Sequence, residues 1–84
     1  MADVTRETYK DWVVTALTQL GPSAPRQVYA WVASNCPIPE TDLNGTTPDG
    51  EPLFEKKVRF ARWDLRREGT IDGSRRGTWA LKTA

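Results

Sequence analysis

The sequence of 84 residues predicts an α+β fold in which helices come first and a small β-hairpin follows. Three stretches repeat apolar residues with the helical period of about 3.6 positions. A short alternating stretch follows them near the end of the chain. Glycine and proline separate these stretches and mark the turns between them. A chain of this length builds one small core, so we expect a single domain over residues 1–84.

The first helix is predicted at residues 6–20, where apolar side chains recur on one face. Thr5 is a suitable N-cap for this helix. Gly21, followed by Pro22, ends it, because proline cannot continue a helix. The predicted inner stripe consists of Tyr9, Trp12, Val13, Ala16, Leu17 and Leu20.

A second helix is predicted at residues 25–36. Pro25 favours the first turn of a helix, and Pro37 ends the helix that precedes it. The extended residues 22–24 are compatible with a short strand. The predicted inner face consists of Val28, Trp31, Val32, Asn35 and Cys36.

Residues 37–52 form a predicted loop with four prolines, two glycines and four acidic residues. A helical turn is compatible with residues 40–43, and Pro48-Asp49-Gly50 indicates a tight turn. A loop of this length in so small a domain is typical of a functional or mobile segment.

The third helix is predicted at residues 53–68, with Gly69 as its C-terminal stop. At about 100° per residue, its side chains divide into two faces. The core face consists of Phe54, Val58, Ala61 and Leu65. The opposite face consists of Lys56, Arg59, Phe60, Trp63, Arg66 and Arg67.

A β-hairpin is predicted at the end of the chain, with strands at 70–72 and 78–82 and a turn at 73–77. The alternation places Trp79 and Leu81 on one face. Three helices followed by such a hairpin have the organisation of a winged helix-turn-helix. In that fold the third helix lies in the major groove of DNA, and the hairpin is called the wing.

The charges are divided unevenly along the chain. Residues 1–52 hold three basic and seven acidic residues, which gives a net charge of −4. Residues 53–84 hold nine basic and four acidic residues, which gives +5. This polarity indicates a polyanionic partner for the C-terminal half.

Several classes of function are disfavoured by composition. The single cysteine, Cys36, cannot form an internal disulfide, and histidine is absent, so no zinc site, metal or cofactor is expected. No stretch is long and apolar enough for a membrane span, and the N-terminus does not read as a signal peptide. We therefore expect a cytoplasmic, nucleoid-associated protein that is not an enzyme. Glu55-x-Lys57, with Asp42 or Asp49 upstream, matches a nuclease pattern by chance, because a helix leaves no room for a catalytic sheet.

The outer face of the third helix is the main candidate for a DNA-binding site. Lysine and arginine displace counterions from phosphates, and an α-helix fits the major groove of duplex DNA. The alternative is an ordinary solvated helix surface, where such residues are common. The expected contacts are Lys56, Arg59 and Trp63 at the bases, and Arg62, Arg66 and Arg67 at phosphates.

The tip of the wing, which spans 70–82, is the second candidate site. Arg75 and Arg76 lie between glycines and are suited to the DNA backbone or the minor groove. We expect the sheet to cover Phe60, whereas the surroundings of Trp63 are left open. The acidic loop is expected to face away from DNA or to shield the basic face.

Three segments carry a more specific signal. Residues 54–62, 65–69 and 76–81 resemble the N-terminal winged-helix domain of Mrr-type restriction endonucleases, and residues 25–31 fit the same pattern. The resemblance covers about residues 6–82. It implies DNA recognition that depends on sequence or base modification. The family domain usually precedes a nuclease domain, and because this chain ends after the wing we expect no cleavage activity.

The sequence therefore predicts a non-catalytic module that binds double-stranded DNA, as a restriction-related module or a transcription regulator. The alternative is a protein-interaction adaptor anchored by Trp63 and Phe60. A homodimer or a partner protein is left open.

Overall fold

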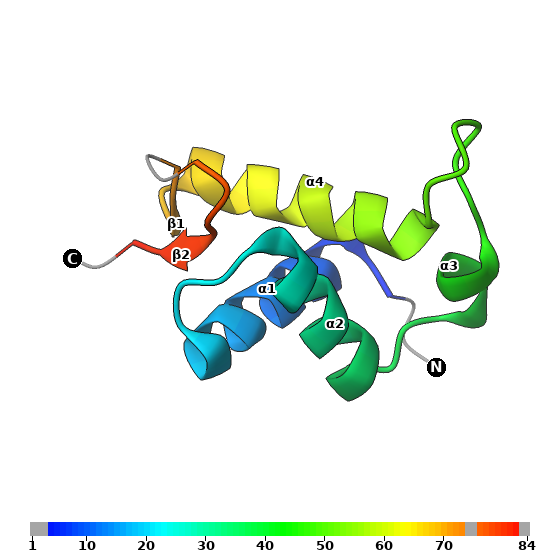
Figure 1. Cartoon of the computed structure of the whole chain (residues 1–84), viewed down its shortest axis with the longest axis horizontal. Helices are drawn as coiled ribbons and strands as arrows, with labels where there is room; N and C mark the ends of the chain where they lie inside the picture. The colour runs from blue at the N-terminus through cyan, green and yellow to red at the C-terminus, as the bar shows by residue number, and fades with distance from the viewer. Residues whose placement is uncertain (1–3, 74–75, 83–84) are drawn as a thin grey trace.

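The computed structural model describes residues 4–73 and 76–82, which form four helices and a two-stranded antiparallel sheet (Figure 1). The α+β class is as predicted. The structure has four helices instead of three, because the turn expected at 40–43 is a helix of five residues. The elements are α1 (Arg6–Leu20), α2 (Pro25–Asn35), α3 (Glu40–Asn44), α4 (Leu53–Glu68), β1 (Ile71–Asp72) and β2 (Ala80–Leu81).

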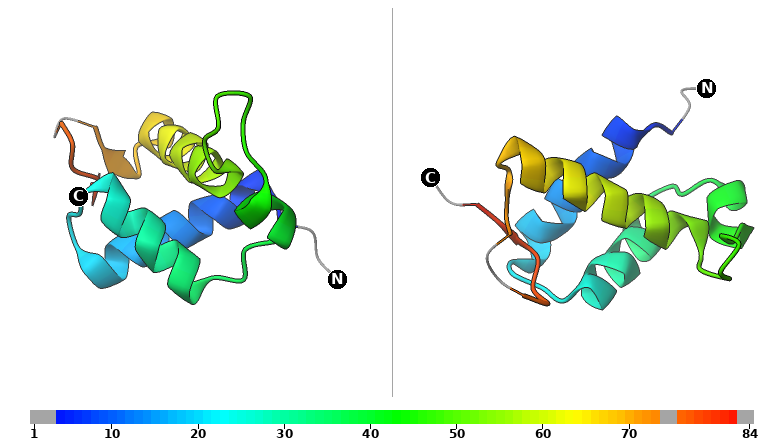
Figure 2. Two further views of the ribbon diagram at one scale, coloured as in Figure 1. Left: turned by 45° about the vertical axis from the view of Figure 1, so that its right-hand side comes forward. Right: turned by 90° about the horizontal axis from the view of Figure 1, so that it is seen from above.

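The helices enclose one core. α1 packs against α2, α4 and β2, while α4 also contacts α3 and β1, so that α4 lies across α1 when the molecule is seen from above (Figure 2). α1, α2 and α4 each bring an apolar stripe with the helical period, whereas the buried side chain of α3 is Asp42. The buried apolar side chains are Tyr9, Val13, Ala16, Leu17, Val28, Val32, Ile38, Val58, Ala61, Leu65, Ile71, Trp79 and Ala80.

The ends of the helices agree closely with the predicted signals. Thr5 caps α1 through a hydrogen bond from the backbone N–H of Thr8 to its hydroxyl oxygen. Gly69 ends α4 in the left-handed region, at φ 85°, and its N–H donates to the carbonyl of Arg66. α2 ends at Asn35, one residue earlier than expected, because Cys36 is extended.

The hairpin is shorter than predicted and is joined to the helices. Ile71 pairs with Leu81, and Asp72 pairs with Ala80. Trp79 pairs instead with Ser23, whose N–H donates to the Trp79 carbonyl at 2.9 Å and whose carbonyl accepts in return at 2.8 Å. The predicted extended segment before α2 therefore holds the hairpin against the helical layer. Two residues of the predicted turn, 74 and 75, lie outside the described residues.

The tryptophans expected in the core are buried to different extents. Trp79 is 5% exposed, whereas Trp12 and Trp31 are half-buried and pack against the outside of the core. Leu20, which the predicted stripe includes, is 42% exposed, since the last turn of α1 extends past the core. No helix within the described ranges is long and apolar enough to cross a membrane.

A buried carboxylate joins α3 to α1 and α4. Asp42 is 4% exposed, and it accepts hydrogen bonds from the Tyr9 hydroxyl and from the Lys57 ammonium group, both at 2.6 Å. Burial acts to raise the pKa of Asp42, but the bonds from Lys57 and Tyr9 outweigh it and the pKa is lowered. A helix of five residues is not stable by itself, so these bonds hold α3 in place.

Replacement of Asp42 with alanine is expected to lower the free energy of unfolding by about 2 kcal/mol, since it leaves the buried Tyr9 hydroxyl without its acceptor. Urea denaturation followed by circular dichroism measures the change. Asp49→Ala, at an exposed position in the loop, is the control and should stay within about 0.5 kcal/mol of the parent. Equal effects of the two substitutions would contradict the role of Asp42.

The lowered pKa of Asp42 also predicts a dependence on pH. A carboxyl whose pKa is lowered in the folded state stabilises it above the unfolded pKa of about 3.9, and this contribution is lost as the pH falls through the folded pKa. The stability difference between the parent and Asp42→Asn should therefore be constant from neutral pH down to mildly acidic pH. It should narrow below about pH 4. A difference that persists in full at pH 2 in thermal melts would be the contrary result.

Candidate nucleic-acid interface

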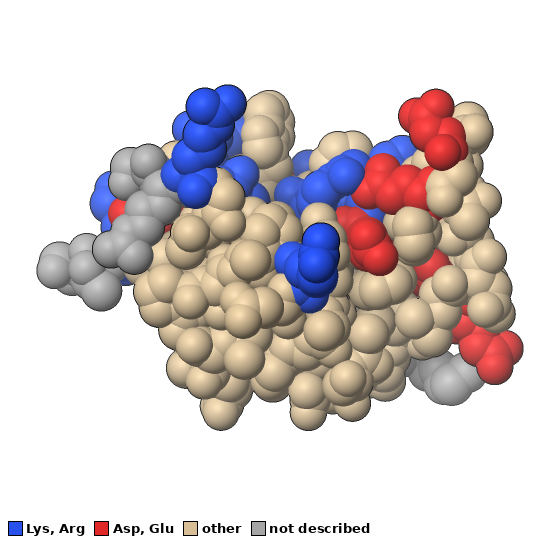
Figure 3. All heavy atoms as spheres, viewed as in Figure 1, with Lys and Arg blue, Asp and Glu red and all other residues tan. Residues whose placement is uncertain are grey.

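α4 presents a charged and aromatic surface on the side away from the core. Burial of Val58, Ala61 and Leu65 fixes the rotation of the helix. The half-buried Phe54 packs at the edge of this core face. We call the opposite side the basic face, and it consists of Lys56, Arg59, Phe60, Trp63, Arg66 and Arg67. In Figure 3 the lysines and arginines gather over α4 and the hairpin end, and the acidic side chains gather toward the loop that precedes α4.

The structure brings most of the predicted contacts together on this face. Arg66 and Arg67 are exposed, as is Arg76 in the hairpin, while Lys56 is half-buried. Arg75 lies outside the described residues. Arg59 and Trp63 are also exposed, whereas Arg62 lies to one side of the basic face and is described below.

Two pairs of neighbouring side chains on the basic face each combine a cation with an aromatic ring. The Lys56 ammonium group lies 5.5 Å from the centre of the Phe60 ring, and the Arg67 guanidinium carbon lies 5.5 Å from that of Trp63. Both pairs have the i,i+4 spacing that places side chains side by side on a helix. Cation–π attraction therefore orders part of the basic face before any ligand binds.

The expectation that the sheet covers Phe60 is wrong. Phe60 is 47% exposed, because the hairpin contacts the C-terminal end of α4 and leaves the middle of the helix open (Figure 1). Trp63, whose surroundings the sequence left open, is 53% exposed. Two large aromatic side chains thus lie in contact with solvent one turn apart.

The acidic loop contacts the basic face through one residue. Glu51 accepts a hydrogen bond from Nη2 of Arg59 at 3.1 Å, and its other carboxylate oxygen forms an ion pair with Nη1 at 2.5 Å. The loop closes on itself, since the Thr47 N–H donates to the Glu51 carbonyl at 2.8 Å and Thr46 pairs with Pro52. Glu51 therefore covers part of the basic face at Arg59, and whether the loop faces away from DNA or shields the face stays a prediction.

Two carboxylates of α4 form ion pairs with basic residues of α1. The Arg6 guanidinium pairs with Asp64, and the Lys10 ammonium group pairs with Glu68 and Glu7. The hydrogen bond from Arg6 lowers the pKa of Asp64 below its ordinary value. These pairs draw the negative charges of Asp64 and Glu68 toward α1.

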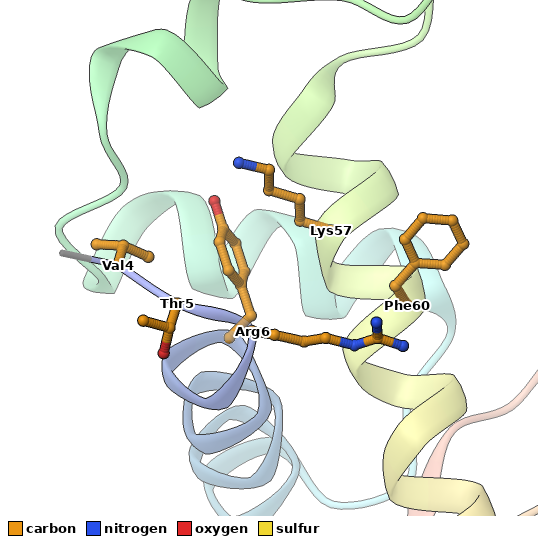
Figure 4. Close-up of a pocket in the computed structure, with 6 residues that line it drawn as sticks. Val4, Thr5, Arg6, Lys57 and Phe60 are labelled. Carbon is orange, nitrogen blue, oxygen red and sulfur yellow. The ribbon is translucent and has the colours of Figure 1, made fainter.

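Lys57, close to the basic face in sequence, has a structural role. In Figure 4 its side chain points away from Phe60, while that of Arg6 extends toward α4. Its ammonium group is bound to the buried Asp42. The nuclease-like pattern of Asp42, Glu55 and Lys57 thus includes a pair that fastens α3 to α4.

A groove lies between the basic face and the start of α2, and we call it the α2–α4 groove. Its volume is about 440 Å³. The Tyr29 ring meets the edge of Trp79 with centres 5.7 Å apart, and burial raises the pKa of Tyr29 to about 12, so its hydroxyl stays neutral. The groove is lined by Pro25, Tyr29, Arg59, Phe60, Arg62, Trp63 and Trp79.

Arg62 lies in this groove and not on the outer side of α4. Its guanidinium carbon is 5.6 Å from the centre of the Trp79 ring. Its Nε atom is buried and has no hydrogen-bond partner within the described part of the chain. Burial, followed by the nearby charge of Arg66, lowers the pKa of Arg62. The side chain is held by an aromatic ring where a carboxylate would be the ordinary partner.

Sequence reasoning missed Tyr29 and Glu51 as parts of this surface. Tyr29 had a detectable signal, because it is an aromatic residue outside the predicted inner stripe of α2, and it packs against the edge of the core at Trp79. Glu51 carried no such signal, since only the folded loop brings it to Arg59.

The described residues contain no cluster of cysteine, aspartate or glutamate that could hold a metal ion. Burial raises the pKa of the Cys36 thiol, which therefore stays protonated at neutral pH. The chemistry available at the basic face is cationic and aromatic binding.

Comparison with known proteins agrees with the resemblance seen in the sequence. The family model described as the Mrr N-terminal domain matches residues 9–84. Searches of curated proteins and of solved structures found no match. The matched range includes α2, α3, α4 and both strands, and all of α1 after its first three residues. The chain belongs to the family of Mrr N-terminal domains.

Proposed function

We propose that this chain is a non-catalytic module that reads double-stranded DNA, with α4 in the major groove. The turn between β1 and β2 would contact the backbone or the minor groove. The order of helices and hairpin, and the pairing of Ser23 with Trp79, support a winged helix-turn-helix in which α4 is the recognition helix.

The observation that carries this proposal is the exposed basic face of α4. Arg66 and Arg67 extend from the last turns, where they can neutralise phosphates and release counterions. Lys56, Arg59 and Trp63 lie nearer the middle and start of the helix, and we assign them to base edges. An arginine there can pair with the two acceptors of guanine.

The hairpin turn is the second proposed contact. Arg76 is exposed, and Gly77 has φ 74°, a conformation that glycine adopts without strain. Arg75 is assigned to the same contact from its place in the sequence. Together with Arg62, which would bind a phosphate at the edge of the face, these arginines complete the proposed DNA surface.

Membership in the Mrr N-terminal family supports a restriction-related role over a transcriptional one. The family is named for an N-terminal domain, and this supports binding without catalysis. A module of this kind would work in the cytoplasm, at the nucleoid.

An adaptor that binds a partner protein is the second candidate. The exposure of Trp63 and Phe60, 53% and 47%, favours it, because large aromatic residues often anchor protein interfaces. In that case the arginines would form the rim of the interface, and duplex DNA would not bind even at low salt.

Fluorescence anisotropy with a labelled duplex of about 20 base pairs tests the main proposal. If about five phosphates are neutralised, the logarithm of the affinity should fall with the logarithm of the salt concentration with a slope of about −4.5. Arg66→Gln and Arg76→Gln should each lower the affinity and make the slope shallower by about 0.9.

The matched control for these variants is Gln19→Glu, which changes the net charge by the same amount on the exposed last turn of α1. It should leave the slope unchanged. A salt-independent affinity, or equal losses in the control and in the arginine variants, would refute the proposal.

Removal of the Glu51 carboxylate is expected to strengthen DNA binding. Glu51→Gln releases the Arg59 fork and removes a negative charge beside the phosphates, which should raise the affinity about three- to tenfold. Asp49→Asn, in the same loop, removes the same charge and is the control. Equal gains in both variants in the anisotropy assay would show that only net charge matters, and not the pair with Arg59.

A further inference from the structure

We propose that the α2–α4 groove binds one unstacked nucleotide of the DNA strand that lies on the basic face. The inference rests on the proposed function, and it adds a site for a base that has left the duplex. The groove opens directly beside this face, because Arg59, Phe60 and Trp63 belong to both.

The first argument is the unpaired donor in the groove. The Nε–H of Arg62 is buried without an acceptor, and no carboxylate lies within ion-pair distance of Arg62 among residues 4–73 and 76–82. Contact with the Trp79 ring holds its guanidinium in place. A guanidinium binds phosphate oxygens through paired N–H donors, and no carboxylate of the described residues competes with a phosphate for the Arg62 guanidinium.

The second argument is the aromatic wall. Trp79 is 5% exposed and is covered by Arg62 and Tyr29, so it positions the arginine and offers no stacking surface. Phe60 and Trp63 are about half exposed and form the outer wall. Exposed rings of this kind hold single-stranded bases by stacking, largely without regard to base identity.

The third argument is size and composition. A volume of about 440 Å³ falls within the range of about 300–1,000 Å³ that is typical of small-ligand sites. Cationic and aromatic groups line the same groove, which matches the two halves of a nucleotide, a phosphate and a flat base. A backbone phosphate alone would leave the aromatic wall in contact with water.

Three duplexes of about 20 base pairs test the inference by anisotropy at one salt concentration. The first is fully paired, the second carries one unpaired base at its centre, and the third has an abasic residue in place of that base. The unpaired base needs no energy to leave a pair, so the second duplex should bind about tenfold more tightly than the first. The abasic duplex should lose this gain.

Variants assign the effect to the groove. Trp63→Ala and Phe60→Ala change exposed side chains and should reduce the preference for the unpaired base to about twofold or less. Arg62→Gln should reduce it as well. Arg66→Gln lies outside the groove lining and should weaken binding to all three duplexes by the same factor. Circular dichroism checks that each variant is folded.

The outcomes separate this inference from the proposed function. Equal binding of the three duplexes, or an unchanged preference in Trp63→Ala and Phe60→Ala, overturns the nucleotide site and leaves paired-duplex binding intact. Binding to the unpaired base alone supports the site and overturns the reading of paired DNA. Absence of binding to any of the three overturns both.

Discussion

The buried carboxylate of Asp42 is the interaction on which the arrangement of the helices around α4 depends. Its two hydrogen bonds reach Tyr9 on α1 and Lys57 on α4, so one side chain fixes three elements. Burial, followed by the bond to Asp42, raises the pKa of the Tyr9 hydroxyl, which therefore remains a donor at neutral pH. With α3 held in this way, the chain returns to α4 in an orientation that brings Glu51 to the basic face.

Carboxylates held at fixed places by the fold also explain why a chain with little net charge presents a basic surface. Acidic side chains are bound at defined places, with Asp64 and Glu68 on the α1 side and Glu51 at one end of the basic face. Electrostatic polarity here results from the fold, which separates groups that alternate along α4. For a DNA-binding role, local geometry of this kind matters more than the overall charge.

The bounds of the long helices could be predicted because they depend on residues close together in the sequence. α1 and α4 each have their own stripe, cap or stop, so their bounds could be read directly. The exposure of Phe60 could not be predicted, since it depends on where the hairpin docks. The docking position is set by the pairing of Ser23 with Trp79, two residues far apart in the sequence. The partners of Asp42 and the groove around Arg62 likewise arise from contacts between distant segments. The candidate residues of α4 were found by periodicity, whereas their partners were not.

The loop before α4 is closed at its base by Gly45 and Leu53, and this closure limits where the domain can vary in sequence. The Leu53 N–H donates to the Gly45 carbonyl at 3.0 Å, and a side chain at Gly45 would meet Leu53 and the Thr41 carbonyl at 2.5 Å. A side chain at Gly45 is therefore poorly tolerated, whereas no residue of the tip at 47–51 belongs to the core. Insertions or grafted peptides at the tip would leave folding intact while altering what lies next to Arg59. Domains with identical helices could thus differ through this turn alone in what they present beside Arg59.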